Sequence, residues 1–288
     1  MRNCCVILVI GATGNVGGAA LRDLARAGAS VRALSRNPGR VPDLGPHVEP
    51  VEGDVERPET VAAAMAGVEK VLLCAGGRDL PATEAEVMGL AEKASVTHLV
   101  LLSSLGVEYG AGSGPVHEPS ERRLRASSLA WTILRPITFM TNTLRWRDSI
   151  AATGTFEEPT GTGTQAMIDP ADIGAVAARV LTTPGHEGRV YELTGPASLT
   201  SAQYAEKLST ALGREVRHVD VPEDVYRARF ANYGAPASFI ESMLTFYALI
   251  KAGKLAMVTP DVERLLGRPG RTFDAWAADN AAAFHAHG

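Results

Sequence analysis

The sequence has few cysteines, no excess of basic residues and no long apolar run. Its three cysteines lie in predicted buried strands, so we expect apolar thiols in a reducing compartment, not a disulfide or metal site. They are Cys4, Cys5 and Cys74. The net charge of −4, with both signs interspersed, argues against nucleic-acid or membrane partners. The first apolar run is too short for a signal peptide or a membrane span, so we expect a cytoplasmic protein. The seven histidines lack metal-ligand spacing, and no metal is expected.

What the sequence does contain is a glycine turn after its first apolar run. Residues 6–10 are predicted to form a strand buried on both faces, and the helix that follows ends at Gly28. Between them the spacing is Gly-x-x-Gly-x-x-Gly, not the commoner Gly-x-Gly-x-x-Gly. A strand, a glycine turn and a helix N-terminus favour a dinucleotide diphosphate; a tight turn without a ligand is the alternative. The predicted binding residues are Gly11, Thr13, Gly14, Asn15, Val16 and Gly17.

The second predicted strand ends at a basic residue. An acidic side chain there would bind the 2′-hydroxyl of NAD, whereas Ser35 and Arg36 suit the 2′-phosphate of NADP. Asn37 offers a further donor, and a solvated arginine is the alternative. We therefore predict NADP(H) as the cofactor.

Two further strand ends are predicted to line the cofactor. Asp54 can accept from the adenine amino group, with Val55 against the ring, and can also cap the next helix, since the two roles are compatible. Ala75 and Gly76 are small and leave room for the sugar and phosphate. A capping box at 83–86 predicts that a helix begins there.

Hydroxyl groups and a histidine are expected near the nicotinamide. Ser103 and Ser104 end the strand at 98–104, where a hydroxyl either binds substrate or carboxamide or is merely a polar strand end. Residues 106–114 are predicted to form a mobile glycine-rich loop. Pro119 favours the first helical position, which places His117 just outside the helix. His117 then binds the nicotinamide ribose, relays a proton, or is a surface residue.

The order of elements predicts the fold class. Strands and helices alternate up to the strand at 131–136, which is typical of an α/β Rossmann-type, doubly wound parallel sheet. We divide the chain into an NADP-binding core, 1–139, and a mixed α/β substrate-binding region, 140–288, that partly returns to the core. Residues 154–163 are predicted to form a loop, and the apolar helix at 239–250 is buried, lines a pocket or lies in a dimer interface.

With these motifs located, the chain resembles the NmrA-like group of atypical short-chain dehydrogenase/reductases, and within it the NAD(P)H-dependent quinone oxidoreductase type. The resemblance spans nearly the whole chain and implies a Rossmann fold and NADP(H). It implies Pro136 as a cofactor contact, and we assign Phe139, Asn142 and Tyr247 to the substrate. It rests on the Gly11–Gly17 turn, Ser35-Arg36-Asn37-Pro38, Gly53-Asp54, His117-x-x-x-Glu121-x-x-Leu124, and residues 132–136 with Phe139 and Asn142.

One departure from the larger superfamily bears on the reaction. The superfamily uses a Tyr-x-x-x-Lys pair, but here Ser113 and His117 stand at those positions. Reduction of an isolated ketone needs a positioned acid, whereas a quinone gives a delocalised, weaker base. We therefore predict NADPH-dependent hydride transfer to a quinone-like or other conjugated aromatic or carbonyl substrate, with His117 and Ser104 as catalytic candidates.

Two alternatives stay open. One is an NADP(H)-binding redox sensor without turnover, which acts through a protein partner. The other is a tailoring reductase or isomerase of secondary metabolism. We expect a small-molecule substrate and a monomer or homodimer.

Overall fold

A computed structural model describes residues 5–77, 79–232 and 234–284, so Cys4 lies outside the described residues. Within them the chain forms two compact units. The first comprises residues up to 104 with 116–136 and 170–192, and the second comprises 105–115, 137–169 and the residues from 193 onward. The units therefore interleave along the sequence, and residues 170–192 belong to the first unit.

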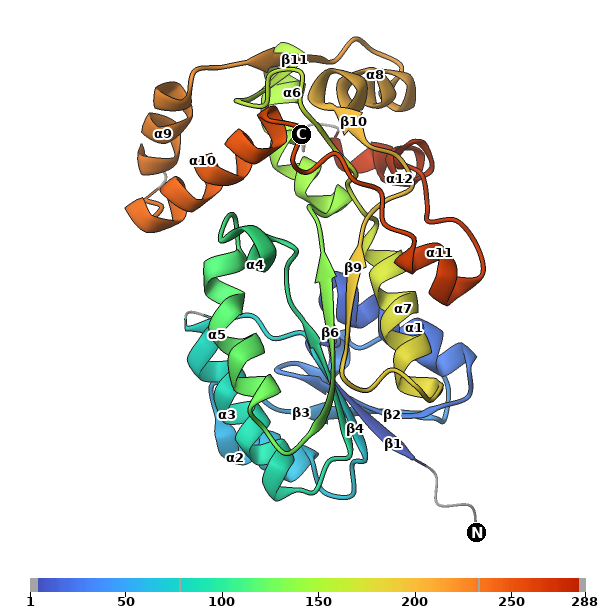
Figure 1. Cartoon of the computed structure of the whole chain (residues 1–288). Helices are drawn as coiled ribbons and strands as arrows, with labels where there is room; N and C mark the ends of the chain where they lie inside the picture. Colours follow the sequence, from blue (N-terminus) through green and yellow to red (C-terminus); the bar gives the residue numbers. More distant parts are fainter. Residues whose placement is uncertain (1–4, 78, 233, 285–288) are drawn as a thin grey trace. The chain divides into compact units, whose positions relative to one another are not determined.

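The first unit is built on a seven-stranded sheet. Its strands are β1 (Val6–Ile10), β2 (Ser30–Ser35), β3 (Val48–Glu52), β4 (Lys70–Leu73), β5 (His98–Leu102), β6 (Ala130–Pro136) and β9 (Arg189–Leu193). Its helices are α1 (Asn15–Arg26), α2 (Pro58–Ala64), α3 (Leu80–Lys93), α5 (Gly114–Arg125) and α7 (Pro170–Thr182). The strand order is β3-β2-β1-β4-β5-β6-β9, and the pairs from β3 to β6 are parallel. Helices α1 and α7 cover one face, and α2, α3 and α5 the other (Figure 1). The predicted Rossmann-type α/β fold is confirmed.

The core of this unit follows from its two covered faces. Leu8, Ile10 and Leu99 are fully buried because helices lie over both sides of the sheet. On the α1 face, a Cβ added to Gly174 of α7 would lie 2.5 Å from the Ala19 Cβ of α1. Only glycine allows this approach, so α7 packs directly behind the helix that follows the glycine turn.

The second unit is mixed α/β. Its strands are β7 (Thr155–Glu158), β8 (Thr164–Gln165), β10 (Leu199–Thr200) and β11 (Arg217–Asp220), and β7 pairs with β11 and β8 with β10. Its α-helices are α4 (Gly106–Tyr109), α6 (Arg147–Thr153), α8 (Ser201–Leu212), α9 (Glu223–Asn232), α10 (Ala237–Lys251), α11 (Asp261–Leu266) and α12 (Phe273–Asn280). Aromatic side chains fill its core, where Trp146 stacks on Phe156 with ring centroids 3.8 Å apart.

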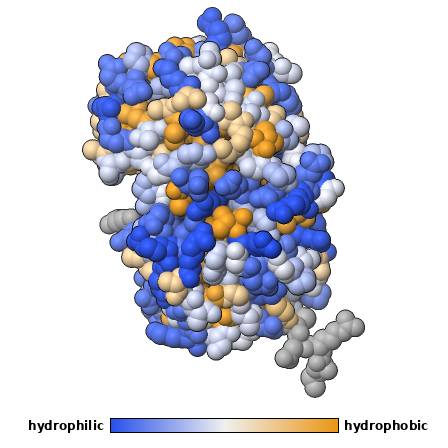
Figure 2. Space-filling model, in the orientation of Figure 1, coloured by the Kyte–Doolittle hydropathy of each residue, from blue (hydrophilic) through white to orange (hydrophobic). Residues whose placement is uncertain are grey.

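The surface carries scattered apolar side chains. Figure 2 shows hydrophilic and hydrophobic residues interspersed on the face that it draws. Across the residues that the structure describes, no helix combines the length and the apolar character needed to cross a membrane.

Two predicted loops and two predicted helix starts were wrong. The expected loop at 106–114 contains α4, and α5 begins at Gly114, so His117 lies inside the helix. The helix can begin this early because residue 114 is a glycine: its backbone lies so close to the Gly106 carbonyl group that a Cβ would overlap it. Helix α3 begins at Leu80, where the Asp79 side chain accepts from Ala82 N at 3.2 Å, so Glu84 lies one turn inside it. The expected loop at 154–163 includes β7.

Candidate cofactor site

The glycine turn is shaped by close backbone approaches. Gly11 has φ +82°, and a Cβ there would overlap the carbonyl oxygen of Cys74 at the end of β4. A Cβ on Gly17 would overlap the carbonyl oxygen of Gly11. The turn is closed by a bond from Gly14 N to Gly11 O at 2.9 Å. These positions therefore require glycine, whatever the turn binds.

The N-terminus of α1 suits an anion. Its N-cap is Gly14, which has no side chain to accept a hydrogen bond from the first-turn amides. The first turn carries no acidic residue that would oppose a bound negative charge. The helix dipole and the backbone N–H groups there favour a phosphate group.

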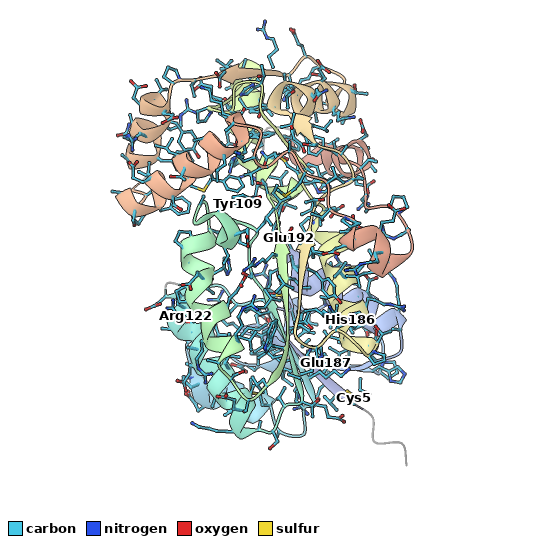
Figure 3. The ribbon with its side chains drawn as sticks, in the orientation of Figure 1. Cys5, Tyr109, Arg122, His186, Glu187 and Glu192 are labelled. Atoms are coloured by element: carbon cyan, nitrogen blue, oxygen red, sulfur yellow. The ribbon has the colours of Figure 1, made fainter. Side chains whose placement is uncertain are left out.

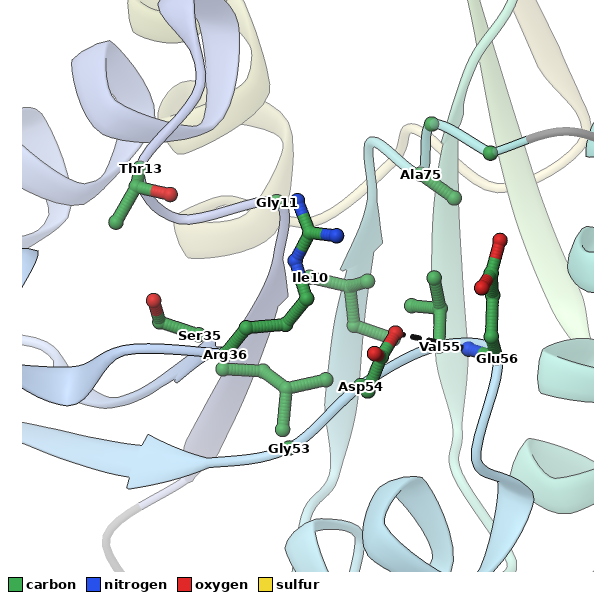
Figure 4. Close-up of a pocket in the computed structure, with 13 residues that line it drawn as sticks. Ile10, Gly11, Thr13, Ser35, Arg36, Gly53, Asp54, Val55, Glu56 and Ala75 are labelled. Carbon is green, nitrogen blue, oxygen red and sulfur yellow. Dashed lines mark hydrogen bonds between the residues drawn. The ribbon is translucent and has the colours of Figure 1, made fainter.

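A cavity of about 320 Å³ opens beside this turn (Figure 4). It lies at the carboxyl ends of β1, β2, β3 and β4, where ligands bind in sheets of this kind. Its lining includes seven of the predicted cofactor residues, namely Gly11, Thr13, Arg36, Asp54, Val55, Ala75 and Gly76. It also includes Glu56, which the sequence analysis missed although it follows the same strand end. The predicted residues that do not line the cavity include Gly14, Asn15, Val16 and Gly17 at the start of α1 and Asn37 in the turn after β2.

Arg36 is the cation of this cavity. Its guanidinium is exposed and has no hydrogen bond or ion pair with another described residue, and Figure 4 shows it extending over the cavity toward Gly11. Ser35 Oγ donates to Asn37 O at 2.9 Å and accepts from Asn37 N at 3.1 Å. These bonds fix the turn that carries Arg36, so the guanidinium is held at the cavity with its donors available.

Asp54 lines the same cavity but does not cap α2. The N-cap of α2 is Arg57, and Asp54 Oδ1 accepts instead from Glu56 N at 3.1 Å. The predicted capping role is therefore wrong. Because this bond uses one carboxylate oxygen, the second stays available to a ligand in the cavity.

A buried carboxylate ties α5 to the ends of β5 and β6. Glu121 is 3% exposed and accepts from Ser103 Oγ at 2.6 Å and from Arg135 at 2.8 and 2.7 Å. Burial alone would raise the pKa of Glu121, but the hydrogen bonds from Arg135 and Ser103 and the charges of Arg135 and Arg125 lower it below its ordinary value. The hydroxyl proton of Ser103 is therefore directed at Glu121 and not at the cavity.

His117 lies one turn before Glu121 on α5. Its Nδ1 is buried and has no hydrogen-bond partner among the described residues. Burial lowers the pKa of His117, although the nearby Glu121 charge raises it in part. The imidazole is therefore neutral at neutral pH, with one nitrogen able to donate and the other to accept.

The other predicted residues are distributed over both units. Ser104 is half-buried directly after Ser103, and Pro136 is buried at the end of β6. In the second unit, Phe139 pairs with Ile168 in an isolated bridge and Asn142 is exposed. Tyr247 is 2% exposed, and its hydroxyl bonds to Glu158, Arg145 and Tyr226.

Comparison with known proteins agrees with this geometry. A family model described as NAD(P)H-binding matches residues 11–184. The chain is 38% identical over 283 residues to a (4-alkanoyl-5-oxo-2,5-dihydrofuran-3-yl)methyl phosphate reductase of Streptomyces griseus, covering 97% of this chain and 99% of that protein. It is 35% identical over 289 residues to an NAD(P)H azoreductase of Xenophilus azovorans, covering 98% and 100%.

Solved structures show the same fold. The NADPH complex of an Escherichia coli NADPH-dependent quinone oxidoreductase is 26% identical, with a TM-score of 0.83 over 95% of this chain and 99% of that chain. The negative transcriptional regulator NmrA in complex with NADP shares the fold at 17% identity, with a TM-score of 0.77 over 96% and 95%. The chain therefore belongs to the NAD(P)H-binding family and is an NAD(P)H-dependent oxidoreductase.

Proposed function

We propose that this protein reduces quinone-like or other electron-poor conjugated acceptors with NADPH. The observation that carries the choice of cofactor is the Arg36 guanidinium, which lies at the cavity without a partner among the described residues. A planar cation with several donors binds a 2′-phosphate well and gains little from a 2′-hydroxyl. NADPH is therefore preferred to NADH.

The residues present fit a dinucleotide from end to end. The glycines at 11, 14 and 17 leave the space that side chains would fill, so the diphosphate would lie against Gly11, Thr13, Gly14, Asn15, Val16 and Gly17. Arg36, with Asn37 in the same turn, would hold the 2′-phosphate, Asp54 and Val55 the adenine, and Ala75 and Gly76 the sugar and phosphate. Ser103 and Pro136 would border the nicotinamide. When bound, the cofactor supplies a hydride; the protein has to align the acceptor and supply a proton.

The acceptor class follows from the groups on α5. Where a Tyr-Lys pair would stand, the helix and the residue before it carry His117 and Ser113, so the strong positioned acid needed for an isolated ketone is absent from these two positions. The azo, quinone and acyl-dihydrofuranone groups in the names of the relatives are all conjugated acceptors. Such acceptors spread the incoming negative charge, so a weak proton donor is sufficient. The neutral imidazole of His117 and the hydroxyl of Ser104 are the candidate donors. Phe139, Asn142 and Tyr247 stay predicted substrate contacts.

Steady-state NADPH oxidation with a panel of acceptors tests the proposal. The panel contains a benzoquinone, an azo dye, an acyl-substituted unsaturated lactone and, as the negative control, an isolated ketone. We expect turnover with at least one conjugated acceptor, none with the ketone, and a lower KM for NADPH than for NADH. Tight NADPH binding with no turnover of any acceptor would contradict the enzyme and favour the redox sensor.

A further inference from the structure

The cofactor cavity carries a carboxylate that the binding of phosphate groups does not explain. Glu56 lines the cavity and is exposed, and its carboxylate has no hydrogen bond or ion pair with another residue that the structure describes. Among the described residues that line the cavity, two carboxylates, Glu56 and Asp54, accompany one cation, Arg36. An ionised carboxylate only accepts hydrogen bonds, and it repels a phosphate group. Glu56 therefore has to face a part of the ligand that carries donors.

Glu56 stands where the segments that follow β3 and β4 approach each other. A Cβ added to Gly77, in the segment after β4, would lie 3.8 Å from Glu56 Oε1 and 3.7 Å from Thr83 Oγ1. Figure 4 shows the Glu56 side chain rising from the segment after β3 toward the end of β4, beside Val55 and apart from the Arg36 guanidinium. The carboxylate therefore belongs to the base side of the cavity and not to its phosphate side.

The main chain fixes Glu56 relative to Asp54. Asp54 Oδ1 accepts from Glu56 N at 3.1 Å, while Thr60 Oγ1 donates to Asp54 O at 3.1 Å and accepts from Asp54 N at 2.9 Å. These bonds close the turn at residues 54–56, so that Asp54 and Glu56 flank Val55. Because the donor at residue 56 is a backbone N–H, replacement of the Glu56 side chain leaves this turn intact.

The adenine end of a dinucleotide offers one group that suits two acceptors. The exocyclic 6-amino group of adenine carries two N–H donors, whereas the ring nitrogens of the base only accept. With Val55 against the ring, the residues on either side of it reach the edge of the base. One oxygen of Asp54 and the carboxylate of Glu56 have no partner among the described residues, so each can take one of the two N–H groups.

We propose that Glu56 is a specificity-determining residue for the base of the coenzyme. It accepts one N–H of the 6-amino group while Asp54 accepts the other, so the cavity selects 6-aminopurine over 6-oxopurine dinucleotides. This inference rests on the proposed function, since it places a nicotinamide dinucleotide in the cavity. A 6-oxo group presents lone pairs to both carboxylates, which then lose their donors and repel the ligand. A site built to bind an N–H group discriminates strongly against a ligand that lacks it.

Calorimetric titration with two coenzymes tests this assignment. They are NADP and nicotinamide hypoxanthine dinucleotide phosphate, in which a 6-oxo group replaces the 6-amino group. We expect the wild-type protein to bind NADP at least about tenfold more tightly. E56A should lower the affinity for NADP about 3- to 10-fold and leave the affinity for the hypoxanthine coenzyme within about twofold. E56Q introduces an amide that can donate to the 6-oxo oxygen, so it should bind the hypoxanthine coenzyme more tightly than the wild-type protein does.

A matched control isolates the position of the charge. E52Q removes the same charge from an exposed residue at the end of β3 that is not part of the cavity lining, and it should keep the wild-type ratio of the two affinities. The unfolding transition of E56A should match that of the wild-type protein, since the Glu56 side chain has no partner among the described residues.

The possible results separate the base assignment from the proposed function. Equal wild-type affinities for the two coenzymes, or a wild-type affinity ratio in E56A, would overturn the role of Glu56 while leaving the reductase in place. A loss of affinity for the hypoxanthine coenzyme alone in E56A would place the carboxylate at the N1–H of that base and would also overturn the assignment. If the wild-type protein binds neither coenzyme, the proposed function fails and the base assignment falls with it.

Discussion

Two buried glutamates, one in each unit, show how differently the two parts of the molecule treat a carboxyl group. Glu158 of the second unit and Glu84 of the first are both 1% exposed. Glu158 Oε1 accepts from Arg145, from Tyr247 at 3.1 Å and from Trp146 at 3.3 Å. Glu84 has no hydrogen-bond partner among the residues that the structure describes, and its pKa is displaced toward neutrality.

The two glutamates differ in the number of hydrogen bonds that compensate for their burial. Around Glu158, three donors from two elements converge on one oxygen, so removing the glutamate leaves several groups without their acceptor at once. Around Glu84, burial is uncompensated, and the free energy of that burial appears as a shifted pKa. Both units hold buried polar atoms without a hydrogen-bond partner among the described residues, but Glu158 has one such carboxylate oxygen whereas Glu84 has two.

The largest effect is expected from Gly17→Ala, which disrupts the glycine turn of the first unit. Its Cβ would overlap the carbonyl oxygen of Gly11, so the turn must open. We expect NADPH binding to be lost in calorimetry and the unfolding free energy to fall by about 3 kcal/mol. The control is Gly89→Ala, also in a helix, where an added Cβ meets nothing within 4 Å. It should bind NADPH normally and gain up to about 1 kcal/mol.

Glu158→Ala disrupts the hydrogen-bonded cluster in the second unit. It removes the shared acceptor of Arg145, Tyr247 and Trp146 and leaves a cavity in an aromatic core. Because Arg145 is 38% exposed, water replaces part of its lost contact, and we expect a loss of about 3 kcal/mol in denaturant unfolding. Glu157→Ala, at a half-buried position that pairs with Arg229, is the control and should cost less than about 1 kcal/mol. NADPH affinity should survive in both variants, since the cavity is lined by the first unit alone.

The pH dependence of stability sharpens the comparison. The pKa of Glu84 rises from 4.5 to about 7 on folding, so the folded state binds the extra proton. The stability that Glu84 contributes is fully present below pH 4.5 and is lost as the pH rises through about 7. Relative to E84Q, the wild-type protein should therefore lose on the order of 3 kcal/mol over this interval. Glu121, with its lowered pKa, has the opposite sign and loses its contribution only in acid. Parallel stability curves for wild type and E84Q would refute the assignment.

The smallest effect is expected from Arg36→Ala. The guanidinium contributes charge-assisted hydrogen bonds to the 2′-phosphate and none to the described protein, so stability should not change. We expect NADPH affinity to fall about 10- to 100-fold while NADH affinity stays within about twofold. Arg40→Ala, an exposed arginine at the end of the following 3₁₀ turn, controls for general charge. An equal loss of affinity for both coenzymes would show that Arg36 does not select between them.

Arg122→Ala is a second control, remote from the cavity. Arg122 lies on the outer side of α5 (Figure 3) and is 71% exposed, so this variant should bind both coenzymes as the wild-type protein does.

Much of the first unit was readable from the sequence because its signals are local. A buried apolar run followed by glycines specifies both the strand and the turn, and Gly28 ends α1 with φ +70° as predicted. Each of these depends on residues within a few positions of one another, so tertiary packing had little to override.

The buried polar groups of α3 and α5 were not readable in the same way. Pro119 favours a helix start at that residue, but Pro115 occupies the first turn of α5 because Gly114 packs on Gly106. The capping box at 83–86 predicted Glu84 in the first turn of its helix. With the observed N-cap Asp79, Glu84 lies further along the helix, on the apolar stripe with Val87 and Met88. Contacts such as Arg145 to Tyr247, 102 residues apart, leave no sequence signature at all.

The packing of Gly174 on Ala19 has a consequence for biosynthesis. The glycine turn emerges from the ribosome early, but the helix that supports α1 from behind is translated much later, at Pro170–Thr182. A nascent chain arrested before residue 170 holds every residue that lines the coenzyme cavity and still lacks this support. Coenzyme capture should accordingly be a late event of synthesis, acquired when α7 docks, and not an early nucleus on which the remaining polypeptide assembles.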